Sequence, residues 1–221
     1  MTAWSQPRAL IFDLDGTLVD TVETRIQAWM ALFGEANIPA DRGEVAALIG
    51  ADGKRLARAV AAAAGIELDE ERAEELDRRS GEIYETLNRD PQPLPGAREL
   101  LSALDDRTIP WAIATSSRRE QVGVSVAALR LRQSPTIVDG SHVEHAKPAP
   151  DLLLRAAATL DVPPSECWYV GDATWDMRAA VAAQMTAIGV TSGAVDAATL
   201  TDAGATAVVG SLHELAARLA R

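Results

Sequence analysis

Residues 9–17 read Ala-Leu-Ile-Phe-Asp-Leu-Asp-Gly-Thr, and this stretch decides the fold. Its first four residues, Ala9–Phe12, are all apolar, which is typical of a strand buried on both faces of a parallel sheet. Side chains alternate along an extended segment, so Asp13 and Asp15 face the same side just after that strand. Gly16 then permits a sharp turn of the backbone. Because ligands of open α/β sheets bind at the carboxyl ends of the strands, we expect a functional site here.

Five later apolar runs have the length of strands, and helical patterns separate them. Several of these runs are unbroken rather than alternating, as in strands that are covered on both faces. Strands and helices that alternate in this way predict an α/β fold with a doubly wound, parallel, Rossmann-like sheet. The expected strands are residues 111–114, 136–138, 167–170, 186–190 and 207–209, and the expected helices are residues 121–131, 151–160, 177–184 and 212–219.

The segment between the first and second strands shows only helical patterns. Apolar residues at positions 26, 29, 30 and 33 follow the spacing of one helix face, and positions 73, 76, 83 and 87 mark a longer helix. An alanine-rich stretch lies between them, and the proline-rich residues 91–96 lead back to the sheet. We therefore predict an all-helical cap domain at residues 19–94, inserted into a Rossmann-like catalytic core of residues 1–18 and 95–221.

Composition narrows the class of protein. The chain has 221 residues, 48% of them hydrophobic, which suffices for one large domain or for a domain with an insert. No apolar run approaches the ~20 residues that a membrane-spanning helix needs. The single cysteine, Cys167, favours a reducing compartment, so we expect a cytoplasmic protein. A net charge of -11 disfavours nucleic acid and anionic membranes as partners, and the sequence leaves the oligomeric state open.

Polar side chains also follow the later strands. Thr115–Ser117 come directly after the second strand, Asp172 comes just after the fourth, and Asp176 lies four residues further on. Lys147 stands before the prolines of a Lys-Pro-Ala-Pro-Asp stretch. Taken singly, each has an ordinary structural explanation, since hydroxyls and aspartates cap helices and a lone lysine is usually solvated. Their occurrence together at strand ends is what indicates catalysis.

The clustered carboxylates predict a cation. Two like charges ~4 Å apart repel by about 4 kcal/mol at an effective dielectric constant of about 20. If Asp13, Asp15, Asp172 and Asp176 converge, the single charge of Lys147 does not balance them. An oxygen-rich ligand set suits Mg²⁺, whereas the three histidines lack the spacing of zinc ligands.

The motifs Asp-Leu-Asp-Gly-Thr-Leu-Val-Asp, Thr115, Lys147 and Gly-Asp-Ala-Thr-Trp-Asp resemble, as a set, those of the haloacid dehalogenase-like hydrolase superfamily. The resemblance is to its phosphoglycolate phosphatase and β-phosphoglucomutase-like branch, and it covers nearly the whole chain. It implies a Mg²⁺-dependent phosphatase of a small phosphorylated metabolite. The helical insert is similar to the cap of that branch, which would choose the leaving group.

The resemblance also implies roles for the core residues. Asp13 would be the nucleophile that forms an aspartyl-phosphate, and Asp15 would be the general acid and then the general base. That exchange requires a pKa near the working pH, which we expect the crowded acidic pocket to raise. Thr115 would hydrogen-bond a phosphoryl oxygen, and Lys147 would offset negative charge.

The resemblance places the metal and substrate ligands as well. Mg²⁺ would be held by Asp13, Asp172 and the backbone carbonyl of Asp15. Asp176 would hydrogen-bond these ligands or contact the ion through a water molecule. Basic residues of the cap are candidates for the leaving-group site, although a solvated helix face explains them equally well. The expected substrate-binding residues are Gly16, Ser116, Ser117, Arg118, Arg25 and Lys54.

Four alternatives to the phosphatase can be compared on the residues, and the phosphomutase and a non-catalytic binding protein stay open. The dehalogenases of the superfamily lack the second aspartate, so Asp15 favours phosphoryl chemistry. The phosphonoacetaldehyde branch needs a cap lysine where this chain has Gly53. A β-phosphoglucomutase-like phosphomutase would carry a histidine at the position of Arg25, but Ser117 and the basic pair Arg118 and Arg119 could hold a second phosphate. From another class, a non-catalytic phospho-ligand-binding protein would not need the complete catalytic set.

Overall fold

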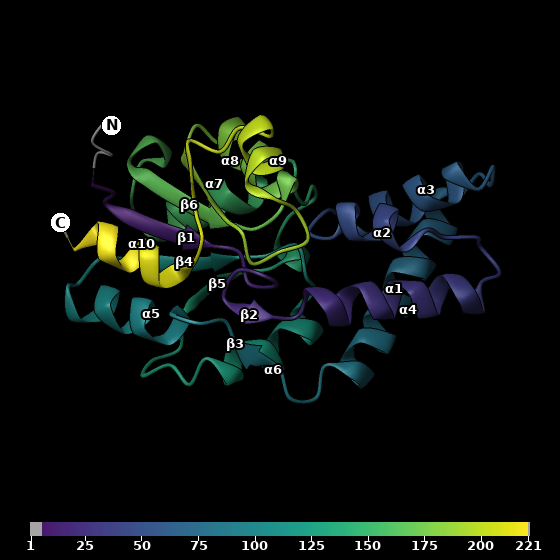
Figure 1. Ribbon diagram of the computed structural model, residues 1–221, viewed down its shortest axis with the longest axis horizontal. Helices are drawn as coiled ribbons and strands as arrows, with labels where there is room; N and C mark the ends of the chain where they lie inside the picture. The colour runs from purple at the N-terminus through teal and green to yellow at the C-terminus, as the bar shows by residue number, and fades with distance from the viewer. Residues whose placement is uncertain (1–5, 221) are drawn as a thin grey trace.

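The computed structural model describes residues 6–220, so the first five residues and the last residue of the predicted core segments lie outside it. Its centre is a sheet of six parallel strands in the order β5-β4-β1-β6-β7-β8, which confirms the α/β Rossmann-like fold (Figure 1). β6 runs one residue further than predicted, and the other five strands have the predicted bounds. The strands are β1 (Ala9–Phe12), β4 (Trp111–Ala114), β5 (Thr136–Val138), β6 (Cys167–Gly171), β7 (Thr186–Val190) and β8 (Ala207–Val209).

Helices cover both faces of the sheet, as the unbroken apolar strands predict. Leu10 and Phe12 of β1 belong to a buried cluster with α5 (Ala97–Asp106), α6 (Arg119–Ala128) and α10 (Leu212–Leu219). The alternate residues of β1, Ala9 and Ile11, belong to a second buried cluster on the other face. That face is covered by α7 (Asp151–Thr159), α8 (Thr174–Ala182) and α9 (Ala197–Asp202).

Four helices form a separate unit beside the sheet, inserted between β1 and β4 (Figure 1). They pack around their own apolar cluster, which includes Trp29, Phe33 and Leu56. A two-stranded antiparallel ribbon, β2 (Val19–Asp20) with β3 (Gln92–Pro93), joins this unit to the sheet. The helical insert consists of α1 (Val22–Glu35), α2 (Arg42–Leu48), α3 (Gly53–Ala63) and α4 (Glu70–Leu87).

Several local details differ from the sequence prediction. The helices α2, α5 and α9 and the ribbon were not predicted. The helices α2 and α9 and the ribbon are too short to show a clear periodicity, whereas α5 has an apolar face at helical spacing, formed by Ala97, Leu100, Leu101 and Leu104. The predicted helix 177–184 begins earlier, at Thr174, where the backbone N–H of Ala173 donates to the Asp176 carboxylate. Leu87, expected on an inward face, is 45% exposed because it ends α4. Short 3₁₀ turns occur at Gly140–His142 and Pro164–Glu166.

Within residues 6–220, no helix combines the length and the apolar character needed to cross a bilayer.

Candidate active site

The first aspartate is fixed by the strand that precedes it. The backbone N–H of Asp13 donates to the carbonyl of Val170 at 2.9 Å, which extends the pairing of β1 with β6. Its carboxylate is buried and accepts a hydrogen bond from Lys147 Nζ at 2.7 Å. Gly16 follows with φ of 82°, and a Cβ there would collide with the carboxylate of Asp172. Glycine at this position therefore lets the turn after β1 pack directly against the Asp172 carboxylate.

Lys147 is a fully buried cation at the centre of the site. Its ammonium donates to Asp13 and to Asp176, each at 2.7 Å, and to the hydroxyl of Tyr169 at 3.1 Å. Burial alone would lower the pKa of Lys147, but the two facing carboxylates raise it well above its ordinary value. Lys147 therefore stays charged and holds two carboxylates in place.

Three buried carboxylates form the group with metal-ligand spacing. Asp13, Asp172 and Asp176 each offer an oxygen, and these oxygens lie within 4.8 Å of one another. Asp172 also accepts a hydrogen bond from Thr17 at 2.7 Å. Burial raises the pKa of Asp13 to about 7, with Lys147 opposing the shift and Asp176 adding to it. Burial and the neighbouring carboxylates raise the pKa of Asp172 well above its ordinary value.

This group fits a divalent cation. Lys147 contacts Asp13 and Asp176 but not Asp172, and burial raises the pKa of Asp172, so a further positive charge is needed for all three carboxylates to be ionised together. All the donors are oxygens, the ligands that Mg²⁺ prefers. The carboxylate of Asp15, which we expected to converge with the other three, is not part of this group, because it is engaged elsewhere; the metal role that the resemblance gives Asp15 belongs to its backbone carbonyl.

Asp15 is surrounded by hydrogen-bond donors rather than by acids. Its carboxylate accepts from Thr21 and Ser117 at 2.6 Å, from Arg25 at 2.9 Å and from the Tyr84 hydroxyl at 3.0 Å. Burial alone would raise the pKa of Asp15, but Arg25 and the two aliphatic hydroxyls hold it below its ordinary value. The expectation that an acidic pocket raises this pKa was wrong, because the nearest charge is a guanidinium.

The loop after β4, residues Thr115–Ser117, supplies three hydroxyl groups to the site. Thr115 is buried, and its hydroxyl accepts from the backbone N–H of Ser117 at 3.1 Å. Ser116 donates to the backbone carbonyl of Gly50, in the loop between α2 and α3, at 3.4 Å. Gly50 has a φ of 88°, and a Cβ there would lie 2.9 Å from Ala173. The loop of the insert thus closes directly onto the core.

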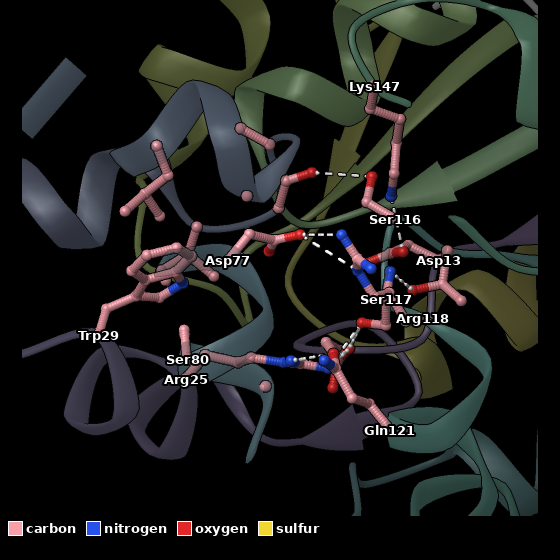
Figure 2. Close-up of a pocket in the computed structure, with 18 residues that line it drawn as sticks. Asp13, Arg25, Trp29, Asp77, Ser80, Ser116, Ser117, Arg118, Gln121 and Lys147 are labelled. Atoms are coloured by element: carbon pink, nitrogen blue, oxygen red, sulfur yellow. Dashed lines mark hydrogen bonds and ion pairs between the residues drawn. The ribbon is translucent and has the colours of Figure 1, made fainter. Parts of the chain in front are cut away.

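These residues line a pocket of about 570 Å³ between the sheet and the helical insert, part of it open to solvent (Figure 2). The core contributes Asp13, Asp15, Thr115, Ser116, Ser117, Arg118, Gln121 and Lys147. The insert contributes Arg25, Trp29, Ile49, Gly50, Ala51, Gly53, Leu56, Asp77, Ser80 and Gly81.

The predicted substrate-binding residues fall into different places. Ser116, Ser117, Arg118 and Arg25 line the pocket, and Gly16 lies behind it against Asp172. Lys54 is not among the lining residues: its ammonium pairs with Glu70 at 3.0 Å and Glu74 at 3.6 Å on the surface of the insert. Arg58, one turn further along α3, also pairs with Glu70, so both cations form surface ion pairs with the adjacent helix α4.

The pocket wall contains residues that the sequence alone does not single out. Asp77, Ser80 and Gly81 lie on one face of α4, and Trp29 lies on α1. Figure 2 shows Asp77 pointing toward Arg118, and Arg25 extending toward Gln121. The helical spacing of residues 77, 80 and 81 is the only signal that could have grouped three of them.

Comparison with known proteins places this site in a family. The model of the haloacid dehalogenase-like hydrolase family matches residues 10–190, and the chain belongs to that family. The resemblance inferred from the motifs is thereby confirmed.

The relatives include phosphatases and a phosphomutase. The chain is 34% identical to a β-phosphoglucomutase of Bacillus subtilis, over 84% of each chain. It is also 34% identical to the fructose-1-phosphate phosphatase YqaB of Escherichia coli, over 82% of this chain and 95% of the relative. A hydrolase structure from Pseudomonas syringae matches with a TM-score of 0.91 and 36% identity, covering 96% of this chain and 97% of the other. Phosphoric monoester hydrolase is the enzyme class consistent with these relatives.

Proposed function

We propose that this protein is a Mg²⁺-dependent phosphatase that hydrolyses a small phosphorylated metabolite through an aspartyl-phosphate on Asp13. One observation carries the proposal: the Asp13 carboxylate lines the pocket between the core and the insert while it is held by a buried ammonium at 2.7 Å. Thr115, on the neighbouring strand end, lines the same pocket. A nucleophile, a cation and a hydroxyl donor thus surround one place where a phosphoryl group can sit.

In the first step an Asp13 oxygen attacks phosphorus, and the bond from phosphorus to the leaving oxygen breaks. Lys147 and the Thr115 hydroxyl stabilise negative charge on the phosphoryl oxygens. The leaving oxygen receives a proton from Asp15. In the second step Asp15 takes a proton from water, which attacks the phosphorus and restores the Asp13 carboxylate. Inorganic phosphate and the free alcohol are the products.

The hydrogen bonds of Asp15 favour its role as general base over its role as general acid. With a pKa below its ordinary value, Asp15 is ionised at neutral pH and ready to accept the proton of water. To carry a proton to the leaving oxygen, Asp15 must lose part of its contact with Arg25, which lies 2.9 Å away. The arriving substrate, which occupies the same pocket as Arg25, is the means to loosen that contact.

Asp13, Asp172 and Asp176 would hold Mg²⁺, and the sequence resemblance adds the backbone carbonyl of Asp15. When bound, Mg²⁺ would neutralise the surplus charge of these carboxylates and that of the phosphoryl group. We take residues 19–94 as the cap domain that closes over this site. A pocket that lies between the core and the helical insert suits a small metabolite rather than a folded phosphoprotein, and we place the enzyme in the cytoplasm.

The second candidate is a β-phosphoglucomutase-like phosphomutase, which the similarity to a β-phosphoglucomutase favours. Two features favour the phosphatase. Arg118, a candidate for holding a second phosphate, pairs with Asp77 at 2.7 Å and Glu74 at 2.6 Å. Arg119 lies 67% exposed and faces Asp139 at 3.5 Å, and it is not among the residues that line the pocket.

Phosphate release from a panel of phosphorylated metabolites tests the proposal, with Mg²⁺ and with chelator, and with Asp13→Asn as the blank. Metal-dependent release that the substitution abolishes is the expected result. Interconversion of sugar 1-phosphates with a bisphosphate primer, without release, would replace the phosphatase by the mutase. Tight binding of phosphate esters without turnover in either assay would point to a non-catalytic binding protein.

A further inference from the structure

The guanidinium of Arg118 bridges the core and the helical insert. Arg118 directly precedes α6, and its side chain donates to Asp77 at 2.7 and 3.1 Å and to Glu74 at 2.6 Å, both on α4. One positive charge therefore faces two carboxylates. Only 36% of the Arg118 side chain and 20% of the Asp77 side chain is exposed, so solvent screens this pair incompletely.

The position of Asp77 depends on a neighbouring glycine. Gly53, the first residue of α3, lies so close to α4 that a Cβ would collide with the Asp77 carboxylate. Both residues line the pocket. The absence of a side chain at Gly53 lets the carboxylate reach the pocket wall, where it meets Arg118 (Figure 2).

The other cations of the pocket are paired as well. Arg25 contacts Asp15 at 2.9 Å, and Lys147 contacts Asp13 and Asp176. Among the described residues that line the pocket, every lysine and arginine therefore has a carboxylate partner. At the Arg118 end of the pocket, Asp77 engages the guanidinium from the pocket wall, and Glu74, which also contacts Lys54 at 3.6 Å, engages it from outside the lining residues.

We infer that Asp77, together with Glu74, determines substrate specificity by occupying Arg118, so that the enzyme selects a neutral, hydroxyl-bearing leaving group. A leaving group with a second anion would meet the Asp77 carboxylate and a guanidinium that is already engaged by two acids. This inference deepens the proposed function and rests on it. A polyol or sugar monophosphate is the substrate class that follows.

The remaining wall of this end suits such a leaving group. Ser80, Gln121 and the Asp77 carboxylate offer hydrogen-bond partners for hydroxyls, and Trp29 and Leu56 offer apolar surface for the C–H face of a polyol.

The test compares substrates that differ only in charge. Glycerol 3-phosphate and 3-phosphoglycerate share one skeleton, with a hydroxymethyl group in one and a carboxylate in the other. The ratio of their kcat/KM values is measured for the natural protein and for the double variant Asp77→Asn with Glu74→Gln. We expect the natural protein to prefer glycerol 3-phosphate. The double variant should shift the ratio toward 3-phosphoglycerate about tenfold, the size of one charge-assisted hydrogen bond from the freed Arg118.

Two controls separate this role from a structural one. Glu70→Gln removes another acid of α4, whose partners Lys54 and Arg58 belong to the insert, and should leave the ratio unchanged. Adding Arg118→Gln to the double variant should abolish the gain. A ratio that does not move, or a gain that persists without Arg118, would overturn the inference.

The charge selection can be tested even if the protein shows no phosphatase activity. If no monophosphate is hydrolysed, the proposed function fails, and calorimetric affinities for the same two compounds then report the same ratio. If the double variant does not fold, Glu74→Gln alone changes a side chain that is 46% exposed and should shift the ratio in the same direction by about threefold. A shift in the opposite direction would refute the charge selection.

Discussion

Replacing Lys147 by methionine removes the cation that contacts both Asp13 and Asp176. The methionine fills a similar apolar volume, but it leaves two buried carboxylates without their 2.7 Å donors. Removing one partner of a buried ion pair typically costs about 3–5 kcal/mol. Because one of the carboxylates can take up a proton, we expect the lower end, about 3 kcal/mol, in the presence of chelator. For a chain of this size that loss corresponds to a fall in Tm of roughly 6–12 °C.

Urea unfolding followed by circular dichroism, at neutral pH and in chelator, measures this loss. Lys54→Met is the matched control, because Lys54 is 30% exposed and its partners are more exposed still. An exposed pair of this kind contributes at most about 1 kcal/mol. The reasoning would be refuted if Lys147→Met lost no more stability than Lys54→Met.

Three further predictions follow from the same site. Asp172→Asn removes one of the three clustered carboxylates, so the rise in Tm that Mg²⁺ produces should largely disappear; an undiminished rise would exclude Asp172 as a ligand. Gly16→Ala should cost more than about 1 kcal/mol in urea unfolding, because φ is 82° and the new Cβ collides with Asp172, whereas Gly34→Ala, with open space around it, should cost nothing. Arg25→Gln removes the main group that lowers the pKa of Asp15, so the acid limb of the kcat/KM profile should move to higher pH; an unmoved limb would contradict the role of Asp15 as base.

The core and the centre of the site could be predicted because they depend on local rules. Apolar strands buried on both faces are recognisable one at a time, and a parallel sheet brings their carboxyl ends to one edge. Asp13 and Asp172 follow strands, Lys147 lies in a loop between elements and Asp176 lies in the first turn of the helix after β6, so their convergence required only the topology. The structure brings these four together.

The surroundings of Asp15 and Arg118 could not be predicted in the same way. They depend on how the helical insert packs on the core. Helical spacing in the sequence shows which face of a helix is apolar, but it does not show which core residues the polar face contacts. Tyr84 reaches Asp15 from α4, although they are 69 positions apart in the chain. Lys54 shows the opposite case, since its charge suggested an anion site while acids of the adjacent helix had already paired with it.

The central claim is that Asp13 becomes phosphorylated during turnover. Rapid acid quenching of the enzyme with Mg²⁺ and the best substrate of the panel, followed by peptide mass spectrometry, tests it directly. We predict that the mass of one phosphoryl group appears on the peptide containing Asp13 during turnover and decays once substrate is consumed. Efficient phosphate release with no modified peptide at any quench time, or with the phosphoryl group on another residue, would contradict the account.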